Sequence, residues 1–234
     1  MSIVKVIQTG PLLVNSLVVS LCKNKVFVVD PACCMFSADE KKISSYLEQN
    51  KLDLVAIVLT HGHFDHVAGL PSLKRMYPDV PILIHKADSF MIGNSSASIQ
   101  AKQLSYIGFS DFIPYVSSLP NFDFELEDEK NLFECLGEFS KSLEDKELKN
   151  ALFSWKILHT PGHTMGSVCL YNAKEKILIS GDTVFYQSWG RTDLGGSEEL
   201  ILKSLARLKK LVEPETTVYP GHDYFGFKMK ENYF

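Results

Sequence analysis

The chain has 234 residues, of which 45% are hydrophobic, and a formal net charge of −4. A chain of this length can bury a full hydrophobic core, and we predict one domain over residues 1–234. The acidic balance and the scattered lysines and arginines exclude a nucleic-acid-binding footprint, while the lack of a leader sequence or a membrane-length apolar run predicts a cytoplasmic protein without membrane contact.

The first predicted elements are strands and helices in alternation. Residues 12–21 and 25–30 are apolar or alternating and are separated by Lys23 and Asn24, a pattern typical of a β-hairpin. Residues 39–50 and 66–77 carry apolar side chains at helical spacing. Strands followed by helices in this order predict a layered α/β fold.

Residues 60–66 read Thr-His-Gly-His-Phe-Asp-His and directly follow an apolar run that ends at Leu59. Imidazole and carboxylate groups are ligands suited to zinc, iron or manganese. His61 and His63 lie two residues apart on a chain leaving a strand and therefore point the same way. Asp65 and His66 follow on the turn, where they can reach a second ion. The segment predicts a metal site.

Residues 122–152 have little strand character and many charged side chains. Leu132, Phe133, Leu136 and Phe139 recur at helical spacing and predict the buried stripe of one or two exposed helices. We therefore predict a helical insertion at about 122–152. A lid or a dimer contact near the metal site is the alternative role of this segment.

Three later apolar segments also end at a glycine and a ligand-type side chain. They lead into His-Thr-Pro-Gly-His at 159–163, Gly-Asp at 181–182 and Pro-Gly-His at 220–222. Glycine permits a tight exit from a strand, so a side chain can turn back toward a shared centre. Four strand ends thus supply the candidate ligands, which are His61, His63, Asp65, His66, His163, Asp182 and His222.

Two further elements complete the predicted fold. Residues 167–172 and 176–180 predict a second hairpin. Ser197, followed by two glutamates, predicts the start of a helix over residues 197–211. Strands and helices thus repeat twice, which suggests two facing sheets with helices outside.

The motifs H-x-H-x-D-H, H-T-P-G-H-T, G-D-T-x-F and Y-P-G-H resemble those of the metallo-β-lactamase superfamily, in particular its hydroxyacylglutathione hydrolase (glyoxalase II) branch. The resemblance implies a four-layer αβ/βα sandwich and two divalent metal ions, with zinc favoured over iron or manganese. It assigns His61, His63 and His163 to one ion and Asp65, His66 and His222 to the other. Asp182 would bridge the two ions.

Such an arrangement suits hydrolysis. Two divalent ions can lower the pKa of a shared water from about 15.7 toward about 7 and polarise a carbonyl, so no serine or cysteine nucleophile is needed. Asp65 is the candidate catalytic residue that orients the water or moves a proton. The resemblance implies a thioesterase acting on a small-molecule thioester, with glutathione as a candidate thiol carrier.

Two residues are candidates for substrate binding. In glutathione thioesterases, a basic residue at the place of Arg191 and a tyrosine at the place of Tyr224 contact the thiol carrier, and the resemblance carries these roles over. Arg191 can grip a carboxylate through two hydrogen bonds. A salt bridge from Arg191 to Asp193 or Asp65 that fixes the loop is an equal alternative.

Other functions stay open. Persulfide dioxygenases share this scaffold and the G-R-T-D sequence, yet use one iron bound by the counterparts of His61, His163 and Asp182. A non-hydrolytic redox scaffold of the flavodiiron type is less favoured, because the chain leaves no room for a flavin-binding domain. The oligomeric state is left open.

Cysteines and two histidines fall outside these motifs. Five cysteines, an odd number without C-x-x-C spacing, predict free and mostly buried thiols. Cys33 and Cys34 fit a turn better than the mouth of the site. His85 and His159 fit a hydrogen-bonded structural role better than the orientation of a metal ligand.

Overall fold

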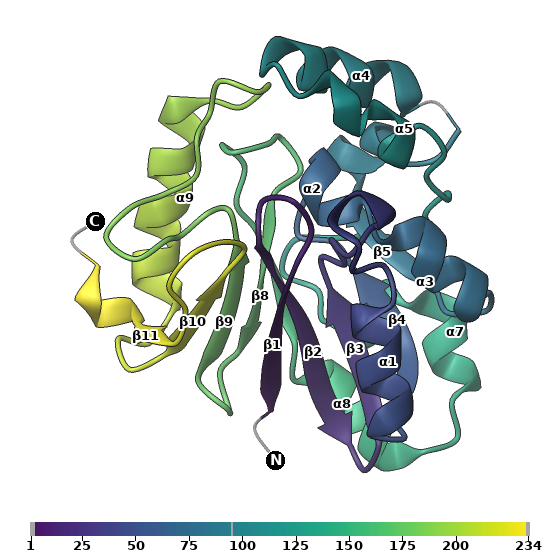
Figure 1. Ribbon diagram of the computed structural model, residues 1–234. Helices are drawn as coiled ribbons and strands as arrows, with labels where there is room; N and C mark the ends of the chain where they lie inside the picture. Colours follow the sequence, from purple (N-terminus) through teal and green to yellow (C-terminus); the bar gives the residue numbers. More distant parts are fainter. Residues whose placement is uncertain (1–2, 95, 233–234) are drawn as a thin grey trace.

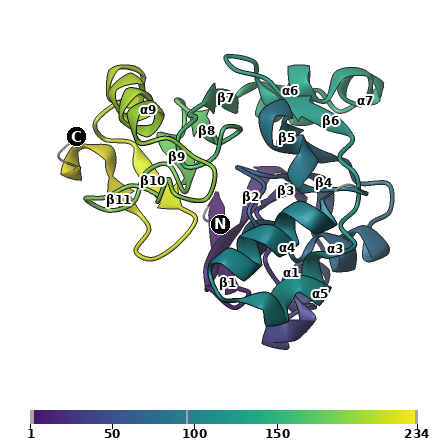
Figure 2. The ribbon, with the colours of Figure 1, turned by 90° about the horizontal axis from the view of Figure 1, so that it is seen from above.

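The computed structural model describes residues 3–94 and 96–232 (Figure 1). Within these residues, two β-sheets face each other and helices cover their outer sides (Figures 1 and 2). The first sheet has the order β1 (Val4–Thr9), β2 (Val14–Cys22), β3 (Lys25–Val29), β4 (Asp53–Val58), β5 (Ile82–His85) and β6 (Phe124–Leu126). The second has the order β11 (Phe227–Lys228), β10 (Thr217–Pro220), β9 (Ile177–Gly181), β8 (Val168–Asn172) and β7 (Lys156–His159).

Strand directions bring several chain exits to one edge. β1, β2 and β3 pair antiparallel, whereas β3, β4, β5 and β6 pair parallel. In the second sheet β9 and β10 are also parallel. The residues that follow β3, β4, β9 and β10 therefore leave the sheets at their carboxyl ends, where ligand sites of open α/β sheets form. Both predicted hairpins, β2–β3 and β8–β9, are confirmed.

Helices form the two outer layers. The first sheet is covered by α1 (Lys42–Gln49) and α3 (Leu70–Met76), while α4 (Ala97–Tyr106) and α5 (Ile113–Val116) lie near the carboxyl ends of its strands (Figure 1). The short turns of this part of the chain are η1 (Met35–Ser37), η2 (Lys86–Met91) and η3 (Ser110–Phe112). The second sheet is covered by α9 (Glu198–Leu211), and η4 (Met229–Glu231) lies beyond β11. The Ser197 hydroxyl accepts a hydrogen bond from the Leu200 amide at 3.4 Å and caps α9, as predicted. The four layers of the expected sandwich are confirmed.

The helical pattern over 66–77 proves to be two helices, α2 (Phe64–Val67) and α3. Gly69 separates them, and its amide donates to the Pro31 carbonyl at 2.8 Å. A β-carbon at Gly69 would lie 2.5 Å from that carbonyl oxygen. The close approach of the β3 exit therefore requires glycine and interrupts the helix.

The prediction of exposed helices at 122–152 is wrong in part. Residues 124–126 form β6 at the edge of the first sheet, followed by α6 (Leu132–Cys135), α7 (Gly137–Ser142) and α8 (Lys146–Phe153). The buried apolar side chains of α6 and α8 belong to the core between the two sheets, which also contains Trp155. The predicted buried stripe is confirmed at Leu132 and Leu136, with Phe133 and Phe139 partly buried, whereas the strand β6 was missed. That the segment is an insertion stays a prediction.

The same segment is not a lid over the predicted metal site. Asp145, at the start of α8, pairs with Lys23 in the β2–β3 turn at 2.9 Å. That turn lies at the opposite end of the sheet from the carboxyl ends of β3 and β4, and Figure 1 shows α8 at that far end. The element above the carboxyl ends is instead α4 (Figure 1). None of the described helices is long and apolar enough to span a bilayer.

Candidate metal centre

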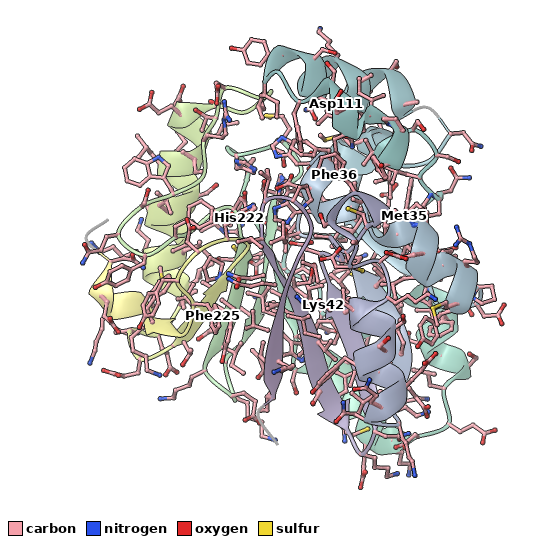
Figure 3. All side chains as sticks on the ribbon, in the orientation of Figure 1. Met35, Phe36, Lys42, Asp111, His222 and Phe225 are labelled. Carbon is pink, nitrogen blue, oxygen red and sulfur yellow. The ribbon has the colours of Figure 1, made fainter. Side chains whose placement is uncertain are left out.

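The seven predicted ligands meet at the carboxyl-end edge of both sheets. His61 and His63 follow β4, Asp65 and His66 lie on α2, His163 follows β7, Asp182 follows β9, and His222 follows β10. Figure 3 shows His222 at the centre of the molecule, above the strands of both sheets. All seven are buried except His222, which is partly exposed.

A first cluster contains His61, His63 and His163. The Nε2 atom of His163 lies 2.8 Å from Nδ1 of His63 and 3.2 Å from Nε2 of His61. Nitrogen ligands of a tetrahedral zinc ion lie about 3.3 Å apart, given a metal–nitrogen distance of about 2.05 Å. Burial, with the neighbouring histidine charges, lowers the pKa of His63 to about 3 and holds the pKa of His61 well below its usual value. Both rings are therefore neutral and can donate a lone pair.

A second cluster contains Asp65, His66 and His222. The Nε2 atom of His222 lies 3.1 Å from Nε2 of His66 and 3.2 Å from Oδ2 of Asp65. Burial alone would raise the pKa of Asp65, but the nearby His66 and His222 lower it. Asp65 is thus ionised and close to both imidazoles of its cluster.

Asp182 lies between the two clusters. Its Oδ1 atom is 3.4 Å from Nε2 of His66, and its Oδ2 atom is 3.5 Å from Nε2 of His163. Burial opposes ionisation, yet His66, His163 and His222 hold the pKa of Asp182 well below its usual value. Oδ1 is buried and accepts no hydrogen bond from the described residues. A buried carboxylate oxygen without a donor is costly unless a cation neutralises it.

This donor set fits divalent metal ions. Five imidazoles and two carboxylates are borderline ligands that suit zinc, iron and manganese. Burial lowers the pKa of His66, but the nearby Asp182, Asp65 and Asp30 raise it well above its usual value. Burial also lowers the pKa of His222, and Asp65 and Asp182 raise it above its usual value. A cation among these carboxylates would replace the protons as the positive charge.

Sequence reasoning missed Asp30, which orients His66. Oδ2 of Asp30 accepts a hydrogen bond from Nδ1 of His66 at 3.0 Å, and the carboxylate also accepts from the Thr60 amide and hydroxyl at 2.8 and 2.6 Å. Since the Thr60 hydroxyl donates to Asp30, it accepts from Nδ1 of His61 at 3.0 Å. Asp30 directly follows β3, so the rule that located the other ligands, a polar side chain after an apolar strand, could have found it.

Backbone carbonyls orient two more rings. Nδ1 of His163 donates to the Arg191 carbonyl at 2.6 Å, and Nδ1 of His222 donates to the Leu12 carbonyl at 3.1 Å. With Nδ1 donating in this way, Nε2 is the ring atom that faces the centre of each cluster and would bind a metal ion. Such outer hydrogen bonds fix the tautomer and orientation of metal-binding histidines.

Asp88 was also missed, and it joins two ligand loops. Its carboxylate accepts from the Gly62 amide at 3.0 Å, the Thr164 hydroxyl at 2.7 Å and the Gly166 amide at 2.7 Å. The first loop carries His61 and His63, and the second carries His163. Asp88 follows β5 within the turn η2, and no sequence motif distinguishes it from a surface aspartate.

Close packing explains the glycine beside His222. A β-carbon at Gly221 would lie 2.2 Å from Oδ1 of Asp182 and 2.7 Å from the His66 ring. Gly181, in contrast, has φ +47°, the strained exit that the sequence predicted. Gly221 is therefore needed for space, whereas Gly181 is needed both for its backbone conformation and for space, since a β-carbon there would lie 2.4 Å from Oγ1 of Thr60.

Of the two predicted substrate-binding residues, one lies in the site. Arg191 lines a cavity of about 310 Å³ that also contains His63, His163 and Asp182. Its guanidinium makes two 2.6 Å hydrogen bonds to Asp193, the alternative role that the sequence left open. The exposed Tyr224 packs against Tyr186, with ring centroids 5.4 Å apart, and is not among the described residues that line the cavity. Substrate binding by either residue stays a prediction.

The remaining candidates are structural. His85 and His159 stack with ring centroids 4.0 Å apart, and each makes a hydrogen bond to the backbone, at Ala87 and Met165. All five cysteines are free thiols, as predicted. Cys33 and Cys34 line a cavity beside α3 rather than the metal centre, and burial raises the pKa of Cys33 to about 12.

Comparison with known sequences agrees with this geometry. The chain is 33% identical over 222 residues to an uncharacterized protein of Aquifex aeolicus, which covers 94% of this chain and 89% of that protein. It is 31% identical over 204 residues to the probable metallo-hydrolase YqgX of Bacillus subtilis, covering 85% and 84%. A hydroxyacylglutathione hydrolase of Pelagibacter ubique is 30% identical over 208 residues, which cover 89% of this chain and 65% of that protein.

Solved structures agree as well. The B3 metallo-β-lactamase BLEG-1 superposes with a TM-score of 0.76 at 26% identity, covering 97% of this chain and 95% of that one. The protein TTHA1623 in a di-iron-bound form superposes with a TM-score of 0.72 at 26% identity, covering 97% and 96%. The family profile of the Metallo-beta-lactamase superfamily matches residues 9–222, a span that contains every predicted metal ligand. The chain belongs to the metallo-β-lactamase superfamily.

Proposed function

We propose that this protein is a hydrolase that holds two divalent metal ions and cleaves a small-molecule thioester. The observation that carries the proposal is the pair of adjacent clusters with Asp182 between them. His61, His63 and His163 would hold one ion, and Asp65, His66 and His222 the other. Zinc is the first choice for this donor set, with iron or manganese as alternatives.

A bound pair of ions would supply Lewis acidity, which lowers the pKa of water toward about 7 and polarises a carbonyl. Asp65 lines the cavity, and Oδ2 of its ionised carboxylate lies 3.2 Å from Nε2 of His222. A carboxylate in this position would orient the attacking water and accept its proton. Phe64 and Ile107 line the same cavity and would limit access of bulk water. Hydrolysis of a thioester then gives a carboxylate and a thiol.

Two observations support a thioester as the substrate. The Pelagibacter ubique relative carries the name hydroxyacylglutathione hydrolase. Arg191 lines the metal cavity with its side chain about half exposed, so a carboxylate of an anionic thiol carrier would compete with Asp193 for its guanidinium. Glutathione is the candidate carrier, and Tyr224 would reach such a carrier only from outside the cavity.

The first test is metal content with activity. Protein purified without an affinity tag containing histidine should hold close to two metal equivalents per chain and hydrolyse thioesters. His63→Ala and Asp182→Ala should lower turnover by at least about a hundredfold, because each removes a donor from a site that works as a unit. His159→Ala, which removes a histidine outside the clusters, is the matched control. Near-normal turnover by either ligand variant would contradict the proposal.

The same measurement separates the persulfide dioxygenase alternative. That reaction would need a single equivalent of iron and would consume oxygen. One iron per chain, with oxygen uptake in the presence of a persulfide and no thioester hydrolysis, would replace our proposal.

A further inference from the structure

A second cavity adjoins the metal centre. It has a volume of about 680 Å³ and lies between η2 and α4 on one side and the loops that follow His163 and Asp193 on the other. The side chains that shape it are Phe90, Met91, Ile99, Tyr106, Met165 and Leu194. A volume of this size is typical of sites for small molecules.

The walls of this cavity are apolar yet open to solvent. Phe90, Tyr106 and Met165 are 50%, 70% and 45% exposed. Large apolar side chains gathered around a hollow are unfavourable in water, which marks such a surface as a binding site. Methionines adapt their shape to different apolar ligands, and both Met91 and Met165 line this cavity.

The cavity adjoins the metal cavity and shares a wall with it. Leu194 lines both, and Thr164 in the second cavity directly follows the ligand His163. At the end of α4, Tyr106 faces the second cavity, whereas its neighbour Ile107 lines the metal cavity. Gln103 of α4 donates to the Leu194 carbonyl at 3.4 Å, which holds the shared wall in place. The second cavity is therefore the apolar hollow next to the metal centre, on the far side of Leu194.

We propose that the second cavity binds the apolar acyl group of the thioester, an inference that rests on the proposed function. Two of the three charged side chains in its lining are already engaged, because Asp193 is paired with Arg191 and Asp88 accepts three hydrogen bonds; the third, Lys102, is exposed. Arg191 lines the metal cavity, so a thiol carrier that contacts Arg191 would lie on that side of Leu194. The acyl carbon would lie at the metal centre and its chain would point past Leu194.

A chain-length series tests the proposal. With one carrier, kcat/KM is measured for acetyl, butyryl, hexanoyl and octanoyl thioesters. Burial of each methylene should raise kcat/KM by about fourfold until the cavity is full. A flat profile, or a preference for acetyl, would overturn the proposal.

Two variants change opposite walls. Ile99→Trp on α4 fills the cavity, and Met165→Glu places a charge in it. Each should lower the octanoyl-to-acetyl ratio of kcat/KM by about tenfold or more, the equivalent of two lost methylene contacts. Met76→Glu on α3 is the matched control, since Met76 is 43% exposed and lies outside both cavities. An equal ratio in all three variants would contradict the assignment.

A binding measurement separates this proposal from the proposed function. Decanoate, titrated calorimetrically into the metal-loaded protein, should bind to wild type and to Met76→Glu and should lose at least about tenfold affinity in the two cavity variants. That result supports apolar binding in the second cavity. If no thioester is hydrolysed, only the proposed thioesterase activity is refuted. Hydrolysis of thioesters without decanoate binding or chain-length preference refutes only the cavity. A dimer that Met165→Glu dissociates, with no change in acyl preference, would assign the cavity to a second copy and overturn the proposal.

Discussion

At the scale of single residues, the candidate metal centre depends on the hydrogen-bond acceptors that orient its histidine rings. His66 is oriented by Asp30, His61 by Thr60, and His163 and His222 by backbone carbonyls. These partners come from different parts of the chain. The imidazole rings are therefore preorganised in the metal-free protein, and preorganisation lowers the entropy cost of binding a metal ion.

Asp30→Asn should weaken metal binding while leaving the fold intact. The amide group can keep one acceptor for Thr60 but places an N–H₂ donor near the Thr60 hydroxyl and the His66 Nδ1–H. We expect a loss of about 10- to 100-fold in metal affinity, the usual effect of removing such a partner. Competition with a fluorescent chelator measures it. Asp111→Asn, at an exposed aspartate labelled in Figure 3, is the control, and equal affinities of the two variants would contradict the prediction.

The sequence identified ligands more readily than their supports. His61, His63, Asp65 and His66 lie within six positions, and the other three follow strands at a glycine, so residue type and position together indicated them. Asp30 also follows an apolar strand, but it has no glycine beside it, so the pattern that indicated the other residues did not include it. Asp88 obeys no rule that one sequence reveals, because its role depends on three donors from loops that meet only in the folded chain.

At the scale of elements, hydrophobic pattern predicted strands and helices well where each buries one face. The two hairpins and α9 follow this rule. Residues 122–152 do not, because β6 has only three residues and the helices α6 to α8 are short. Such short elements contain few buried positions, so their hydrophobic pattern is weak and the composition of the segment resembles that of a solvated one.

Trp155 connects these short helices with the core between the two sheets. It is buried between the sheets against Phe27, with ring centroids 5.3 Å apart and planes at 82°. Its carbonyl also accepts the amide of Leu132 at the start of α6 at 2.9 Å.

Trp155→Ala should lower the free energy of unfolding by about 3–5 kcal/mol, since it leaves a cavity in the core. Urea unfolding followed by circular dichroism measures the change. Trp189→Ala replaces an exposed tryptophan and should cost less than about 1 kcal/mol. Similar losses in the two variants would show that the core between the sheets does not depend on Trp155.

At the scale of the whole molecule, buried neutral histidines make stability depend on pH. Burial, and then the neighbouring His159, lower the pKa of His85 to about 4. In the unfolded chain the same ring titrates near about 6.5. Between these values the unfolded state binds a proton that the folded state does not, so the free energy of unfolding falls as the pH drops from 6.5 to 4 and is unaffected by His85 above 6.5.

His85→Asn removes this titration and keeps an acceptor for the Ala87 amide. In chelator-treated protein, the midpoint of thermal unfolding should therefore fall less for the variant than for wild type between pH 7 and pH 4.5, with the gap opening only below about 6.5. Parallel midpoints across that range would show that His85 does not contribute. The raised pKa values of His66 and His222 act at higher pH and cancel in the comparison.

The division of the ligands between the two sheets has a practical consequence. The facing nitrogen atoms belong to residues 100, 102 and 156 positions apart in the chain. A chain whose sheets have docked in the wrong register still carries the four donors of residues 61–66, but lacks the nitrogens and the carboxylate that the second sheet brings. Such a chain would hold any ion with fewer donors and therefore less tightly. Under the proposed function, metal content after purification would thus report on the docking of the two sheets.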